Sequence, residues 1–196
     1  MKTLRYIVPL VVGFVFSTPA LAIEAPSVAA GAVKAGSVAS EIPKLGKISP
    51  NGPYRLWIAI NNVLPEYALS KGGRELKSRV EGLSAFEFEG KTPGDVLAQA
   101  KEYRATLDRL RVKFKLATVK TYKDPLGRAV TPGVVFVNAG HIMDATAHAF
   151  HATSKEPDTV ILGGFYDVPV VTGKSPSHVF GLVELATRRL RLIAGS

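Results

Sequence analysis

An internal repeat is the feature that most constrains how this chain can fold. Gly-Lys-Thr-Pro at residues 90–93 recurs as Gly-Lys-Ser-Pro at residues 173–176, which is 83 residues later. A second pair of Ser/Thr-Pro dipeptides, at residues 49–50 and 131–132, is separated by 82 residues. Because these two offsets nearly agree, we interpret the sequence as a unit of about 82 residues that is present twice.

The two copies, residues 45–111 and 126–193, each hold two helix starts. Ser or Thr before a helix accepts a hydrogen bond from a free backbone N–H, and Pro in the first turn has no N–H to leave unpaired. We expect Pro65 to end or kink the first helix, and the Gly72-Gly73 break to precede a short helix over residues 74–80. The four starts predict helices over residues 50–64, 93–111, 132–152 and 176–193.

Apolar residues follow these starts at the spacing of one helical face. After Val96 and after Val179 the spacing is 4, 3, 4 and 3 residues, which is that of an amphipathic helix packed against its neighbours. The expected core residues are Trp57, Ile60 and Leu64; Val96, Ala100, Tyr103, Leu107 and Leu110; Val135, Ala139, Ile142, Thr146 and Phe150; and Val179, Val183, Ala186, Leu190 and Ile193.

We therefore predict an all-α fold, a four-helix bundle made of two duplicated helical hairpins. The alternative is an α+β fold with a short strand pair. Residues 111–116 alternate basic and apolar side chains, and residues 159–162 and 168–172 are rich in β-branched side chains. Such segments favour extended structure.

The first 44 residues are predicted to lie outside the folded domain. Residues 1–22 have a basic start, an apolar stretch and an Ala-Leu-Ala end, the pattern of a cleaved signal peptide. Residues 23–44 are rich in Ala, Ser, Gly, Val and Pro and are expected to form a flexible leader. The helical domain is placed at residues 45–196. We expect a periplasmic or secreted protein with no integral membrane segment after cleavage.

Composition excludes several kinds of chemistry. The sequence has no cysteine, so disulfide scaffolds, thiolate metal sites and Cys nucleophiles are ruled out. No P-loop and no Gly-x-Ser-x-Gly element is present, and we predict that the chain is not an enzyme. The net charge of +9 falls to +7 when Lys2 and Arg5 leave with the signal peptide. An exported basic protein meets acidic proteins or anionic envelope components rather than nucleic acid.

A stripe of His and Asp residues is the first candidate site. At 100° per residue, the members of this stripe fall within an arc of about 80° on the helix predicted over residues 132–152. Imidazole and carboxylate groups on one face suit zinc or copper. The alternative interpretation is a solvated face, because the stripe points away from the expected core. The candidate ligands are His141, Asp144, His148 and His151.

A basic stretch is the second candidate site. Residues 101–128 hold nine Lys or Arg residues against three acidic ones. Charge runs of this kind are usually solvated surface, but this one could bind an acidic partner. The candidate basic edge consists of Arg104, Arg109, Arg111, Lys113, Lys115, Lys120 and Lys123.

Two functional hypotheses follow from these candidate sites. The first is an exported, non-enzymatic binding module of the bacterial cell envelope that contacts an acidic protein or an anionic envelope component through its basic edge. The second is a periplasmic protein that binds zinc or copper on the His/Asp face. The sequence itself requires no cofactor.

Overall fold

The Ser/Thr-Pro dipeptides begin helices as the sequence predicts. A computed structural model describes residues 48–117, 129–154 and 163–195, and within these ranges it contains helices and no strands. The predicted all-α bundle is therefore confirmed for the described part of the chain, and the alternative strand pair is not formed there. Residues 159–162 lie outside it. The helices are α1 (Asn51–Glu81), α2 (Pro93–Lys113), α3 (Pro132–Thr153) and α5 (Pro176–Ala194).

Side chains at the helix starts hold the first turns. Thr131 accepts a hydrogen bond from the Val134 amide. In α2 the Thr92 hydroxyl accepts one from the Asp95 amide, while the Asp95 carboxylate accepts one from the Thr92 amide. This reciprocal pair is a capping box. The hydrogen bonds that the Asp95 carboxylate accepts from Thr92 lower the pKa of the Asp95 carboxyl. The N-terminal turns of α2 and α3 are thus specified by local sequence, whereas α1 begins without a side-chain cap.

Helix α1 continues through Pro65 instead of ending there. A proline cannot donate to the carbonyl four residues earlier, which here belongs to Asn61. Arg189 of α5 takes that place, because its Nη1 donates to the Asn61 carbonyl oxygen at 3.2 Å. The expected end or kink at Pro65 is therefore wrong, because a tertiary contact satisfies the carbonyl.

The break in α1 occurs at Gly72 and Gly73, where the sequence predicts it. Gly73 has φ 68° and ψ −163°, a conformation open essentially to glycine alone. The chain then turns back on itself, so that Lys77 Nζ lies 2.6 Å from Glu66 Oε1. The short helix predicted over residues 74–80 forms after this reversal and contributes Leu76 and Val80 to the core.

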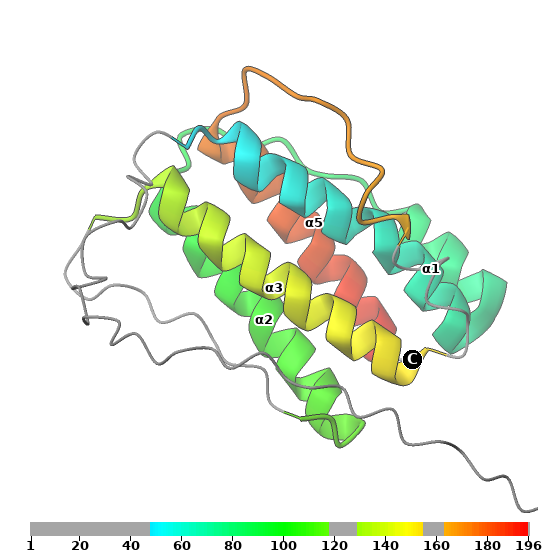
Figure 1. The fold of residues 1–196 in the computed structure, drawn as a ribbon. Coiled ribbons are helices and arrows are strands. Elements are labelled where there is room, and N and C mark those ends of the chain that lie inside the picture. The colour runs from blue at the N-terminus through cyan, green and yellow to red at the C-terminus, as the bar shows by residue number, and fades with distance from the viewer. Residues whose placement is uncertain (1–47, 118–128, 155–162, 196) are drawn as a thin grey trace, which may run out of the picture. The chain divides into compact units, whose positions relative to one another are not determined.

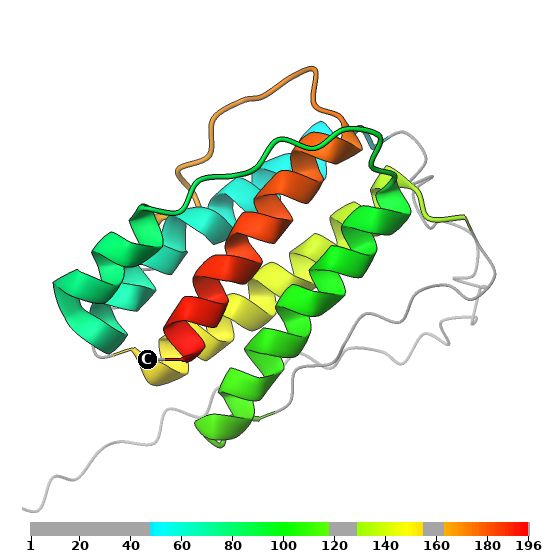
Figure 2. The same cartoon turned by 180° about the vertical axis from the view of Figure 1, so that it is seen from behind.

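The part of α1 before Gly72 and the whole of α2, α3 and α5 run in the same direction. The prolines at their starts, Pro50, Pro93, Pro132 and Pro176, line one small apolar cavity, so the four N-terminal ends meet at one end of the bundle. Figures 1 and 2 show the helices running side by side from that end. Helices α1 and α2 each pack against both α3 and α5. The predicted hairpins are not formed, because a hairpin needs antiparallel neighbours.

Long returns connect the parallel helices. A helix of 20 residues is about 30 Å long, and an extended chain covers about 3.3 Å per residue. A return along one helix thus takes at least about nine residues, and the connection at residues 82–92 exceeds this. It runs beside α5, where Leu83 and Ser84 carbonyls accept hydrogen bonds from Arg189 and Arg188. Figure 2 shows this segment along the bundle.

The core consists of five layers with one residue from each helix. Layer residues lie 3, 7, 10, 14 and 17 positions after the first proline of each start, and all are buried. From the N-terminal end, the layers are Pro53, Val96, Val135 and Val179; Trp57, Ala100, Ala139 and Val183; Ile60, Tyr103, Ile142 and Ala186; Leu64, Leu107, Thr146 and Leu190; and Tyr67, Leu110, Ala149 and Ile193. Every core residue that the sequence predicts is buried.

Large and small side chains alternate around the layers. Trp57 shares its layer with two alanines, and its ring meets that of Tyr103 edge-on, with centroids 5.3 Å apart. Burial raises the pKa of Tyr103, whose hydroxyl lies 3.1 Å from that of Thr146. Such matching lets the large Trp57 ring pack closely inside its layer.

We predict that Ala139→Leu destabilises the protein by about 1–3 kcal/mol, because Ala139 is buried in the layer that holds Trp57 and three further carbon atoms overpack it. Ala152→Leu on the exposed side of the same helix changes stability by less than about 0.5 kcal/mol. Urea unfolding of both variants measures the difference. Equal effects would contradict the layer arrangement.

Candidate functional site

The predicted basic edge is divided by the fold. Side chains of Arg104 and Arg111 are 7% and 5% exposed, and both face the inside of the bundle. Arg109, Lys113 and Lys115 are exposed. Lys120 and Lys123 lie outside the described residues. The described cations therefore belong to two different environments rather than to one continuous edge.

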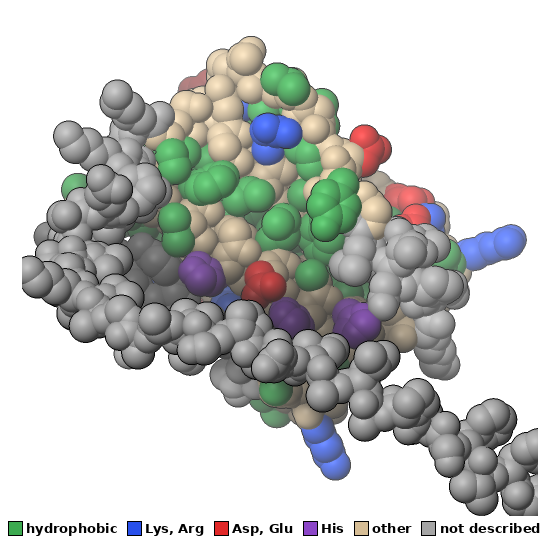
Figure 3. Space-filling model, viewed as in Figure 1, with side chains coloured by type: hydrophobic (Ala, Val, Ile, Leu, Met, Phe, Trp, Pro, Cys, Tyr) green, Lys and Arg blue, Asp and Glu red, His purple; other side chains and the backbone are tan. Residues whose placement is uncertain are grey.

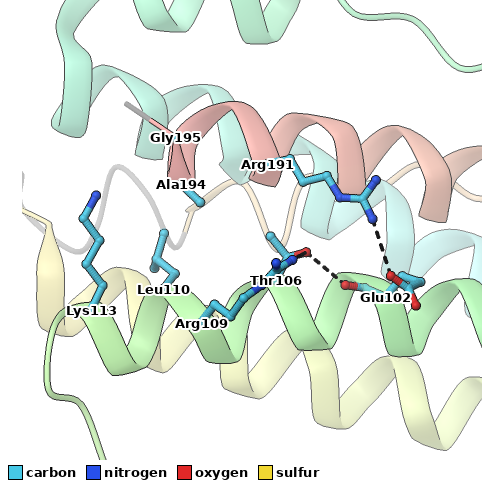
Figure 4. Close-up of a pocket in the computed structure, with 8 residues that line it drawn as sticks. All are labelled: Glu102, Thr106, Arg109, Leu110, Lys113, Arg191, Ala194 and Gly195. Carbon is cyan, nitrogen blue, oxygen red and sulfur yellow. Dashed lines mark hydrogen bonds and ion pairs between the residues drawn. The ribbon is translucent and has the colours of Figure 1, made fainter.

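Two of the exposed cations, Arg109 and Lys113, border a groove between α2 and α5. The groove has a volume of about 600 Å³ and lies toward the C-terminal ends of both helices (Figure 4). Three of the side chains that line it are basic, and one is acidic. Its lining residues are Glu102, Thr106, Arg109, Leu110, Lys113, Arg191, Ala194 and Gly195.

Few interactions hold the charges in this groove. Arg109 donates a hydrogen bond to the Thr106 hydroxyl at 3.1 Å. Arg191 Nη2 lies 3.4 Å from Glu102 Oε2, and both of these side chains are more than half exposed. Exposed ion pairs of this kind contribute only about 0–1 kcal/mol. An incoming anion can therefore displace Glu102 at little cost.

Of the two buried arginines, Arg104 lines a second space, a cavity of about 250 Å³ between α2 and α3. Arg104 Nε lies 2.9 Å from each oxygen of Asp108. Asp108 is also the ion-pair partner of Arg111, with Oδ1 and Nη1 3.7 Å apart. The lining residues are Ala100, Lys101, Arg104, Ala105, Asp108, Asn138, His141 and Ile142.

The histidine stripe lies on the exposed side of α3, and Figure 3 shows histidines in a row on this face. His148 Nε2 is 3.6 Å from Asp144 Oδ1, while His141 lines the cavity beside Arg104. Among the described residues, no three His, Asp or Glu side chains come together closely enough to hold a metal ion. The geometry gives no support to a shared site of His141, Asp144, His148 and His151, and zinc or copper binding there stays a prediction.

Sequence reasoning missed the connection between the two candidate sites. Arg104 and His141 lie on different helices and line the same cavity. Asn138 also lines this cavity, and it belongs to neither of the two candidate sites. Its position four residues before Ile142 on the inner part of α3 was the available signal, since a polar residue there needs a partner.

Comparison with known proteins finds no matching protein family, curated protein or solved structure. Within the described ranges, none of the helices combines the length and the apolar character that crossing a membrane requires.

We predict that Asp108→Asn destabilises the protein by about 1–3 kcal/mol, since it removes the carboxylate, itself 42% exposed, that two buried guanidinium groups share. Glu102→Gln removes one charge from the same helix but breaks only an exposed pair, so its effect is below about 1 kcal/mol. The midpoints of urea unfolding measure both. A small effect for Asp108→Asn would show that Asp108 is not the main counter-charge of these arginines.

Proposed function

We propose that this chain is an exported, non-enzymatic binding module of the bacterial cell envelope. Its binding surface is the α2–α5 groove, and its partner is an acidic segment of another protein. The observation that carries this proposal is the grouping of Arg109, Lys113 and Arg191 around one groove with Glu102 as the single acidic lining residue.

Helix direction gives the basic residues a structural role as well. The negative ends of aligned helix dipoles favour cations in the last turns. Lys113 and Arg191 occupy such positions in α2 and α5. This role stabilises the bundle without neutralising the cations, because helix-end partial charges are about half an elementary charge each. The groove remains positive toward an approaching partner.

The shape of the site favours a protein segment over an envelope surface. The groove of about 600 Å³ is concave. An extended protein segment that carries a row of acidic side chains fits such a space. A lipid surface is better matched by a flat basic face with apolar side chains that enter the membrane interface. Binding to anionic vesicles should therefore be measured beside binding to an acidic peptide.

Substitution of the three groove cations tests the proposal. We expect Arg109→Gln, Lys113→Gln and Arg191→Gln together to weaken binding of a fluorescent oligoglutamate peptide about ten-fold at low salt. The difference should shrink as salt is raised, because exposed charges are screened. Fluorescence anisotropy measures both effects.

The matched control removes three exposed cations of α1, with Arg55, Arg74 and Arg79 changed to Gln. Both triple variants carry the same net charge. Equal weakening of peptide binding by the two variants, or no binding of the peptide to the parent at low salt, would contradict the proposal that the α2–α5 groove is the binding surface. Stronger binding to phosphatidylglycerol vesicles than to the peptide would indicate that the partner is an envelope surface and not a protein segment.

The proposed export route has its own test. When the chain is expressed in a Gram-negative bacterium with its N-terminus intact, we expect the protein in the periplasmic fraction to begin at residue 23. The apolar stretch followed by Ala-Leu-Ala is the reason for this expectation. Intact-mass measurement of the fraction identifies the first residue. Retention of residues 1–22 in the cytoplasm would contradict export.

A further inference from the structure

Helix α3 presents one pair of metal-binding side chains to solvent. His148 Nε2 lies 3.6 Å from Asp144 Oδ1, and the two side chains are 66% and 60% exposed. They are four residues apart, so they lie one above the other on the same face of the helix. Within the described ranges, each is the only polar contact of the other. A metal ion can therefore reach both donor groups from solvent without displacing a third side chain.

The separation of the two donor atoms suits zinc. Zinc binds imidazole nitrogen and carboxylate oxygen at about 2.0–2.2 Å, so two such donors in a tetrahedral site lie about 3.3–3.5 Å apart. The observed 3.6 Å is close to this separation. Copper(II) favours square-planar sites, in which neighbouring donors at similar bond lengths lie about 2.9 Å apart. The pair is thus arranged for a tetrahedral ion.

Two donors make only half of a structural zinc site. Such sites have four protein ligands at the corners of a tetrahedron. Among the residues that the structure describes, no third His, Asp or Glu joins the pair. A two-fold axis through the metal supplies the missing donors, because it brings Asp144 and His148 of a second copy to the same ion. The completed site has two nitrogen and two oxygen ligands.

The surface of α3 allows a second copy to approach. Helix α3 contains no Lys or Arg, whereas α1, α2 and α5 each contain at least three. In a chain with a net charge of +9, repulsion between two copies is therefore weakest at this helix. Gly140 lies one turn before Asp144, and a Cβ atom added there would meet no other atom within 4 Å. The space beside the donor pair is thus open to another helix.

We propose that Asp144 and His148 form half of a zinc site, and that zinc joins two copies of the chain through α3. His148 binds through Nε2, and Asp144 binds through one carboxylate oxygen. The two carboxylates of the pair of copies balance the double charge of the ion, so the completed site is neutral. This ligand set is smaller than the stripe of four His and Asp residues that the sequence suggests.

The zinc site is separate from the α2–α5 groove, because no residue of α3 lines that groove. The inference therefore does not depend on the proposed acidic partner. The triple groove variant, with Arg109, Lys113 and Arg191 changed to Gln, should bind zinc as the parent does. Failure of one proposal is thus distinguishable from failure of the other.

Zinc titration of the tag-free protein tests the site. We expect one zinc ion per two chains, measured by competition with a chromophoric chelator, and a doubling of the particle mass in light scattering that EDTA reverses. Asp144→Asn and His148→Ala should each weaken zinc binding at least ten-fold and prevent the doubling. Both side chains are exposed, so these variants keep the fold.

Two further variants make the test specific. His151→Ala is the matched control, since it removes a histidine from the same helix and should leave zinc affinity unchanged. Gly140→Gln fills the open space beside Asp144 and should prevent the doubling of mass. Absence of zinc binding to the parent would overturn the proposal, as would equal losses for His151→Ala and His148→Ala. Zinc binding at unchanged mass, or a doubled mass in EDTA, would overturn the shared site.

Discussion

The common start of the four helices at one end of the bundle is the constraint on which the rest of the structure depends. Four Ser/Thr-Pro starts meet around a small apolar cavity, and this sets the same axial register for every helix. Because all helices rise at the same rate per residue, equal distances from the starts give equal depths in the bundle. The five core layers follow from this register, and so does the pairing of large side chains such as Trp57 with small ones such as Ala100.

Parallel helices impose two further requirements. Every connection has to travel back along the bundle, and the described returns do so against α5 and α1, where Arg188 holds the Ser84 carbonyl and Asn62 holds that of Asp167. The helix dipoles also add, which collects negative partial charge at the C-terminal end. Basic residues lie at that end, where the negative partial charge favours them. Lys71 of α1 donates to the carbonyl of Thr153 at the end of α3, and its ammonium lies 4.6 Å from the centre of the Phe114 ring at the end of α2.

Helix α2 connects this architecture to the proposed function. One side of it borders the α2–α5 groove with exposed Arg109 and Lys113, and another side places Arg104 and Arg111 inside the α2–α3 interface. Exposure separates the two roles. Exposed cations exchange partners readily and suit a mobile acidic segment. The buried arginines are fixed by packing and by their shared partner Asp108.

Local sequence by itself determined the helix starts, the Gly72-Gly73 break and the core face of each helix, because capping, glycine conformation and apolar spacing act within a few residues. Only the tertiary structure decided the helix direction, since a 4, 3, 4, 3 spacing buries the same residues in parallel and antiparallel bundles. It likewise decided that α1 passes through Pro65, because the compensating donor, Arg189, is more than a hundred residues away. The division of the basic edge has the same cause: which cations face α3, α5 or water depends on the neighbours of α2, and spacing along one helix does not specify those neighbours.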